Sequence, residues 1–178
     1  SSAFGYGAMQ YSSADNATGI GQYALSGATG DKNAALGNSA GAIAKGSANS
    51  VMVGYQAGYQ ATGNYNVWMG YRAGYSVTDA AAYENVGIGQ EALMNITSGY
   101  QNVAVGRRAG YSATTANNLV LIGREAGYNL TTGSSNVLIG MQAGYNVTKG
   151  AENVMIGQSA GQNYAGTTSG VYGAFGVF

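Results

Sequence analysis

The chain repeats a short pattern in which alternating apolar positions run up to a glycine. If that glycine is numbered position zero, an alanine follows three residues later in each of ten units. The intervals between these glycines are 16 to 19 residues, and a fainter copy of the pattern occurs at Gly173. A fixed period of this length is typical of a solenoid, in which each unit stacks on the next. The position-zero glycines are Gly5, Gly21, Gly37, Gly54, Gly70, Gly89, Gly106, Gly123, Gly140 and Gly157.

The residues before each glycine predict a β-strand because apolar side chains occupy every second position. Position minus three is mostly valine, as in Val103, and position minus one is mostly valine or isoleucine, as in Val105. These two columns share one face of the strand, and we expect them to fill the interior of the coil. An apolar residue at position plus seven, as in Val147, predicts a second short strand. Frequent glycine and clustered β-branched residues argue against helices.

The expected fold is therefore all-β: a parallel β-solenoid, or β-roll, of about ten coils of 16–17 residues. We expect residues 1–166 to form this repeat domain and residues 167–178 to form a C-terminal cap or tip. Because Ser2 already fits the repeat, we also expect the chain to be a piece of a longer protein.

Position minus two is also apolar, although strand alternation would turn it away from the valines. A strand that is apolar on both faces is normally buried on both. Monomers avoid an exposed apolar stripe that is several coils long. We therefore expect partner chains to cover the minus-two residues Met52, Trp68, Leu121, Leu138 and Met155.

Three further columns bear on whether the coils stack in register. Position plus two alternates in charge, which predicts opposite charges about 4.8 Å apart on neighbouring coils, although scattered surface charge is an alternative. Asparagine at minus four predicts an amide ladder inside the turns. Tyrosine at plus five predicts stacked rings, or alternatively a stripe that binds sugars. The charged column at plus two consists of Arg72, Glu91, Arg108 and Glu125. The asparagine column at minus four consists of Asn33, Asn66, Asn85, Asn102, Asn136 and Asn153. The tyrosine column at plus five consists of Tyr59, Tyr75, Tyr111, Tyr128 and Tyr145.

The composition argues against several function classes. The 178 residues include 31 glycines and no proline, cysteine or histidine, and seven basic residues balance seven acidic ones. Such a chain offers no field for nucleic acid or anionic lipid, and its apolar runs are too short to cross a membrane. Without histidine and cysteine the usual catalytic triads and zinc sites are absent, and no pair of acidic residues is suggested by spacing. We therefore expect no catalytic residue, cofactor or metal, and a protein that is not an enzyme.

The repeat resembles two groups of fibrous proteins. Residues 49–54 (Asn-Ser-Val-Met-Val-Gly) and 102–106 (Asn-Val-Ala-Val-Gly) resemble the asparagine–valine–isoleucine–glycine units in the head domains of trimeric autotransporter adhesins. The longer unit at residues 127–140 resembles repeats of bacteriophage tail-fibre proteins and related bacterial surface fibres. The resemblance spans Ser2 to about Gly166, although this unit is longer than the autotransporter head repeat. It implies a left-handed, homotrimeric β-roll, in which the minus-two residues would form the trimer interface.

The resemblance implies a non-enzymatic fibre segment outside the cell, on a cell surface or a virion, that attaches to a cell-surface glycan or protein receptor. Irregular segments are the candidate receptor sites: Tyr83 in the longer loop 78–84, and Tyr172 and Phe175 near the C-terminus. One alternative is a passive spacer of a larger fibre. Another is an ice- or surface-binding solenoid, but the threonines at plus eight lack a partner column two residues away. A carbohydrate-cleaving spike would need the missing acid pair.

Overall fold

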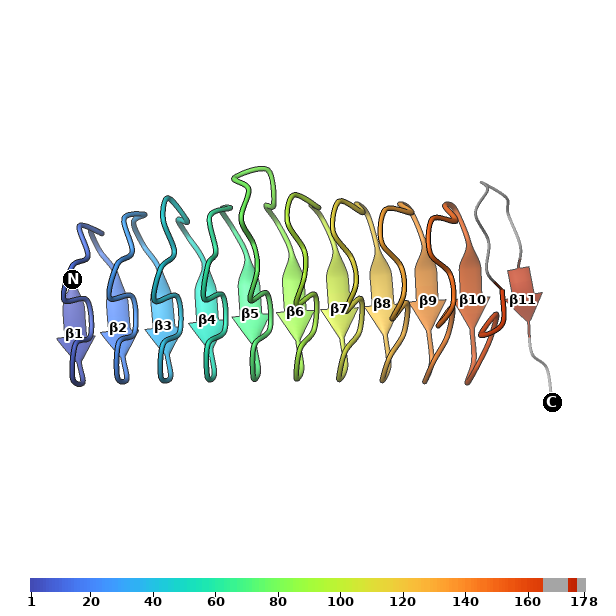
Figure 1. The fold of residues 1–178 in the computed structure, drawn as a ribbon, viewed down its shortest axis with the longest axis horizontal. Helices are drawn as coiled ribbons and strands as arrows, with labels where there is room; N and C mark the ends of the chain where they lie inside the picture. Colours follow the sequence, from blue (N-terminus) through green and yellow to red (C-terminus); the bar gives the residue numbers. More distant parts are fainter. Residues whose placement is uncertain (165–172, 176–178) are drawn as a thin grey trace.

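In the computed structural model, which describes residues 1–164 and 173–175, the chain winds into a long parallel β-solenoid (Figure 1). Each coil contributes one three-residue strand, and the eleven strands form a single sheet in sequence order. The predicted all-β solenoid is therefore confirmed. The strands are β1 Ser2–Phe4, β2 Thr18–Ile20, β3 Ala34–Leu36, β4 Val51–Val53, β5 Val67–Met69, β6 Val86–Ile88, β7 Val103–Val105, β8 Val120–Ile122, β9 Val137–Ile139, β10 Val154–Ile156 and β11 Gly173–Phe175.

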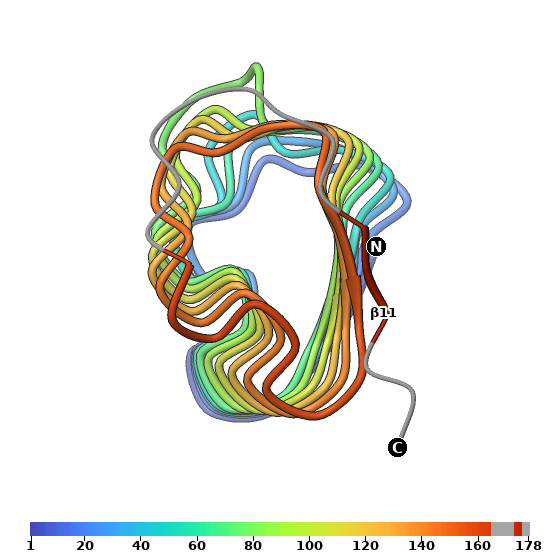
Figure 2. The ribbon, with the colours of Figure 1, turned by 90° about the vertical axis from the view of Figure 1, so that its right-hand side faces the viewer.

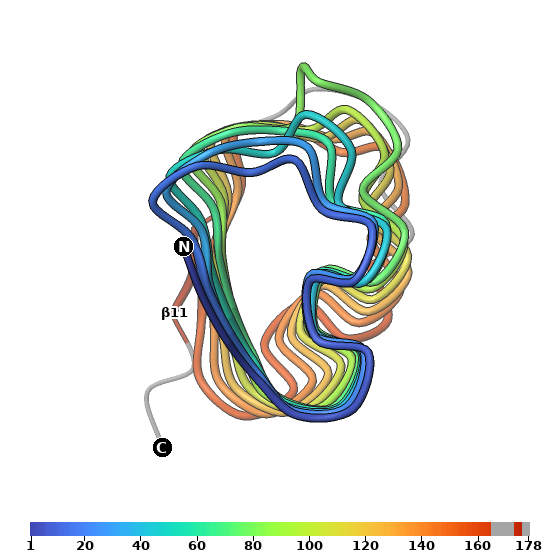
Figure 3. The ribbon, with the colours of Figure 1, turned by 90° about the vertical axis from the view of Figure 1, so that its left-hand side faces the viewer.

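Neighbouring strands pair in parallel with equivalent positions side by side, so that Leu121 of β8 lies beside Leu138 of β9. Seen from the C-terminal end, the chain descends along the strands and rises on the opposite side while it advances toward the viewer (Figures 1 and 2). The coil is therefore left-handed, and the view from the N-terminal end agrees (Figure 3).

Two details of the predicted repeat need correction. Gly173 pairs with Val154, so it occupies position minus three and not position zero. β11 extends the sheet by one strand, and the division into a repeat domain and a C-terminal cap or tip stays a prediction. The second strand predicted at position plus seven does not form in the described residues, where that side of the coil is irregular.

The interior of each coil is filled by the minus-two column, and the predicted orientation of the strands is wrong. Met52, Trp68, Leu121 and Leu138 are completely buried within the single chain, and Met155 is 2% exposed. These side chains pack into one core with the alanines at plus three and the apolar residues at plus seven. They therefore do not form a trimer interface. The minus-three and minus-one columns, which the sequence was expected to place inside, point outward instead.

The position-zero glycines mark the corner where the chain leaves each strand. Their φ angles lie between +126° and +138°, which side chains with a Cβ rarely adopt. The backbone of the next coil is also close: a Cβ on Gly123 would lie 2.5 Å from the carbonyl oxygen of Gly140. Both reasons favour glycine at this corner from Gly5 to Gly140, and the φ angle alone favours it at Gly157.

Large and small residues compensate one another inside the solenoid. Trp68 in β5 lies beside Gly87 in β6, where a Cβ would come 2.8 Å from the indole ring. Gly74, on the opposite wall of the coil, is closer still to the same ring. The interior therefore accommodates a tryptophan because neighbouring positions in the same core carry no side chain.

The predicted asparagine ladder forms, and it satisfies backbone groups that the short strands leave unpaired. The Asn102 Nδ2 atom donates to Asn85 Oδ1 at 2.9 Å and to the Ala116 carbonyl oxygen at 2.9 Å. Leu119 interrupts the column, but its backbone N–H still donates to Asn102 Oδ1 at 3.0 Å. All six asparagines of the column are buried. The ladder is thus structural, since its amides are directed into the coil.

Candidate functional surfaces

The outward side chains of β1–β10 form a long apolar surface, which we call the strand face. It has two parallel columns, at positions minus three and minus one, and many of its side chains are half-exposed, such as Ile122 at 40% and Leu36 at 51%. A contiguous apolar surface of this kind usually marks an interaction site. The strand face consists of Ser2, Thr18, Ala34, Val51, Val67, Val86, Val103, Val120, Val137 and Val154, with Phe4, Ile20, Leu36, Val53, Met69, Ile88, Val105, Ile122, Ile139 and Ile156.

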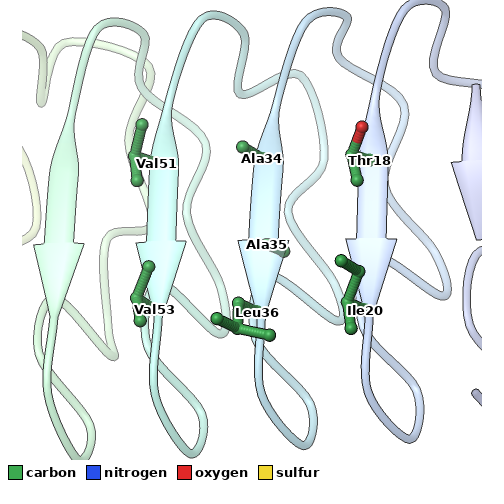
Figure 4. Close-up of a pocket in the computed structure, with 7 residues that line it drawn as sticks. All are labelled: Thr18, Ile20, Ala34, Ala35, Leu36, Val51 and Val53. Atoms are coloured by element: carbon green, nitrogen blue, oxygen red, sulfur yellow. The ribbon is translucent and has the colours of Figure 1, made fainter. Parts of the chain in front are cut away.

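The strand face is hollowed near its N-terminal end. Ala34 in β3 has a shorter side chain than its column neighbours Thr18 and Val51, and the resulting apolar depression is bordered by Leu36 (Figure 4). The large Leu36 side chain thus lies on the same strand as the small Ala34 side chain. The depression has no charged residue in its lining and offers no group for acid–base or nucleophilic chemistry.

The predicted charge ladder at plus two is formed in part. Arg108 Nε donates to Glu91 Oε2 at 2.6 Å, and this hydrogen bond raises the pKa of Arg108. The carboxylate of Glu125 pairs instead with Arg107, at 2.8 Å, from the neighbouring column. Arg72 donates to the Gln56 side chain at 2.9 Å. Pairs as exposed as these contribute little to stability, so the ladder chiefly fixes side-chain positions.

The plus-five tyrosines form the predicted stack. Tyr111, Tyr128 and Tyr145 lie parallel, with ring centroids 5.1 Å apart at each step and interplanar angles of 4°. Burial in this stack raises the pKa of Tyr128 above its ordinary value of 10.0, although nearby Arg108 acts in the opposite direction. Because the inner rings cover one another's faces, they present their edges to the surroundings. This column is better suited to packing than to stacking on sugars.

The longer loop produces a projection at one level of the rod. Between Gly70 and Gly89 the interval is 19 residues, and the loop before β6 extends beyond the outline of the other coils (Figures 2 and 3). Tyr83, a predicted receptor-binding residue, lies at the base of this loop and stacks on Tyr100 with centroids 5.1 Å apart. Of the other two predicted receptor-binding residues, Phe175 ends β11, five strands away from β6, and Tyr172 lies outside the described residues.

Within residues 1–164 and 173–175, no group of three or more acidic, histidine or cysteine side chains is placed to hold a metal ion. No helix in that part of the chain is long and apolar enough to cross a membrane. Comparisons with protein-family models, with curated proteins and with solved structures found no match.

Proposed function

We propose that this chain is a non-enzymatic segment of an extracellular fibre and assembles as a homotrimer through the strand face. The observation that carries this proposal is the pair of outward aliphatic columns that follows the rod through β10. Its length is roughly 45 Å for ten strands about 4.8 Å apart, and its two columns lie about 7 Å apart. Covering this face removes apolar surface from water, which stabilises the assembly by about 25 cal/mol for each Å² buried.

A narrow stripe parallel to the rod axis fits a threefold arrangement. Three such stripes can face one axis, so that the minus-one column of each chain packs against the minus-three column of the next. The side-chain sizes support this pairing within single coils. Ser2 shares its strand with the large Phe4, and Ala34 shares its strand with Leu36. In a trimer with coils in register, Leu36 of one chain would fill the depression over Ala34 of its neighbour.

The resulting rod would act in attachment, either by presenting a receptor-binding surface or by spacing such a surface from its anchor. A second candidate is binding to ice or another ordered surface. One observation favours it: the strand face is a regular array whose two columns are separated by one residue, the arrangement that the threonines at plus eight lack. The columns are mainly aliphatic, with Thr18 as their one threonine, and self-association buries aliphatic side chains better than contact with ice does.

The mass of the chain in solution tests the proposal. We expect a trimer for the unaltered chain and a monomer for Ile122→Lys, which places a charge in the middle of the strand face. Gln90→Lys adds the same charge at an exposed position outside that face and should leave the trimer intact. Circular dichroism should show the same fold in both variants. A monomeric parent chain would overturn the trimer, and a Gln90→Lys variant that dissociates as readily would overturn the assignment of its contact to the strand face.

Cysteine cross-linking tests the register, because the natural chain contains no cysteine. Ile139→Cys lies near one end of the strand face, in β9. In the proposed parallel trimer with coils in register, this cysteine faces Val137 of the neighbouring chain, so it should cross-link upon oxidation when it is mixed with Val137→Cys. In an antiparallel assembly it would cross-link only when mixed with Ile20→Cys from the other end. That second result would refute the parallel arrangement.

A further inference from the structure

The projecting loop and the two coils beside it form a surface on which aromatic rings lie next to exposed polar groups. It sits on the side of the coil that precedes the strand, not on the strand face itself (Figures 2 and 3). Tyr65 is 59% exposed there, and Glu84 and Gln101 are exposed as well. We call this surface the shoulder, and it consists of Tyr65, Asp79, Tyr83, Glu84, Tyr100 and Gln101.

The loop that carries the shoulder is held in place by its own hydrogen bonds. Asp79 Oδ1 accepts from the Ala81 backbone N–H at 2.9 Å, and the Asp79 carbonyl oxygen accepts from Ala82 N–H at 3.0 Å. Ala82 is completely buried, and its carbonyl oxygen accepts from Asn66 Nδ2 at 2.8 Å. The two extra residues thus form an anchored projection, so little ordering would be needed when a ligand binds.

The Tyr83 ring lies at one end of a two-ring stack. Tyr100 covers one face of this ring, at an interplanar angle of 3°. On the other side the equivalent residue is Asn64, whose Oδ1 accepts from Ala48 N–H at 2.8 Å and is therefore directed away from Tyr83. The stack of rings ends at this point. A pyranose ring, which has an apolar C–H face, can pack on the end of such a stack.

Polar groups beside the rings complete the chemistry of a sugar site. Gln101 Nε2 donates to Glu84 Oε2 at 3.0 Å, which leaves the other carboxylate oxygen and the amide oxygen able to accept from hydroxyl groups. Asp79 adds a second carboxylate on the projection. The shoulder contains these two acids and no lysine or arginine, so it disfavours sialylated, sulfated or phosphorylated glycans.

We propose that the shoulder binds neutral hexopyranose units of a cell-surface glycan. One copy presents a flat and therefore weak site. In the proposed trimer, on which this affinity gain depends, three copies lie at one level of the rod and bind a branched or repeating glycan together. Linking sites in this way raises the apparent affinity without any new contact. The site makes the widened coil a receptor-binding collar, while the regular coils form the shaft.

Binding of soluble hexasaccharides of glucose, galactose, mannose and N-acetylglucosamine tests the single site, with sialic acid oligomers as the anionic comparison. We expect millimolar binding of at least one neutral sugar, and about a tenfold loss in Tyr83→Ala. Tyr128→Ala is the matched control, because it removes a stacked tyrosine that lies outside the shoulder. Glu84→Gln should weaken the exclusion of the sialic acid oligomers.

The outcomes separate this proposal from the trimer. If the parent chain is trimeric but binds no neutral sugar, or if Tyr128→Ala weakens binding as much as Tyr83→Ala, the shoulder is not a glycan site. If the chain is monomeric and the tenfold difference persists, the site is correct and the trimer is wrong. Circular dichroism of each variant would show whether a loss of binding results from unfolding. Tyr83→Phe, which keeps the aromatic ring, should retain binding.

Discussion

The orientation of the strands can be tested with two adjacent residues of β8. Leu121 is completely buried in the coil, whereas Ile122, the next residue, is 40% exposed on the strand face. Leu121→Ala and Ile122→Ala each remove three carbon atoms from the same short strand. Because the two variants lose the same number of carbon atoms at neighbouring positions, a difference in their stability reports which of the two side chains faces inward.

The structure indicates a large cost for Leu121→Ala. The walls around this side chain are glycine backbone: a Cβ on Gly110 would lie 2.8 Å from one of its methyl groups, and a Cβ on Gly127 would lie 3.1 Å from the other. Both glycines donate backbone hydrogen bonds to the next coil and cannot move inward to fill a cavity. We expect a loss of about 3–5 kcal/mol in the free energy of unfolding, the upper part of the range for leucine-to-alanine changes.

For Ile122→Ala in a single chain the loss should be smaller. Three carbons at about 0.8 kcal/mol each, reduced for the exposed fraction, give about 1–1.5 kcal/mol. The side chain should matter more when chains associate, since the proposed trimer buries it. Its effect on the unfolding midpoint should therefore depend on protein concentration, whereas most of the Leu121→Ala loss should remain at every concentration.

Urea denaturation is a convenient assay because Trp68 is the chain's one tryptophan and is completely buried. Its fluorescence should change when the coil around β5 opens, and circular dichroism would show whether the remaining coils open with it. Equal losses for Leu121→Ala and Ile122→Ala in dilute, monomeric samples would refute the inward and outward assignment. A larger loss for Ile122→Ala under those conditions would reverse it.

Three further predictions concern the corner, the ladder and the stack. Gly123→Ala should lower the free energy of unfolding by about 3 kcal/mol or more, because its φ is +128° and a Cβ would meet the next coil. Gly46→Ala should lower it by about 1–2 kcal/mol, because a Cβ has space there. Equal shifts in the melting temperatures of the two variants would contradict this difference. Asn102→Ala should lower the free energy of unfolding by about 1–3 kcal/mol, because it leaves the buried Leu119 N–H without its acceptor. An unchanged free energy in urea denaturation would contradict the structural role of the asparagine ladder. The pKa of Tyr128 is raised in the folded chain, so its contribution to stability is present below pH 10 and lost as the pH rises through the folded value; melting curves of Tyr128→Phe should show a weaker decline above pH 10.

The repeat and its register could be read from the sequence because glycine and alanine recur at fixed places. The orientation of the strands could also have been read, from Asn102 and Ala104. Asparagine at minus four was correctly placed inside the turns, and alternation then requires minus two to be inside as well. The uniform valine and isoleucine columns suggested a core instead. In this narrow coil the core column varies from Gly87 to Trp68, while the outward columns are the uniform ones.

Parts of the candidate surfaces could not be inferred from the repeat. The sequence located the long interval and singled out Tyr83, but it gave no sign that Tyr83 would stack on Tyr100 from the next coil. These two residues lie at position minus six, where other units carry asparagine, aspartate, serine or alanine. The contribution of Glu84 and Gln101 was missed for the same reason. Both follow the tyrosines directly, and their contact depends on a backbone with positive φ at each residue.

The way in which each column varies explains where function can reside in such a rod. Position zero cannot vary, because the Gly123 corner meets backbone atoms of the next coil that have no freedom to adjust. The interior can vary only when neighbours compensate, as Gly87 does for Trp68. The strand face must stay aliphatic along its length if chains are to associate through it. The corners before the strand combine exposure with freedom of residue choice, and the two-residue insertion lies at such a corner. A binding site added there disturbs neither the core nor the proposed contact between chains, which is why the shoulder is the surface to test for recognition.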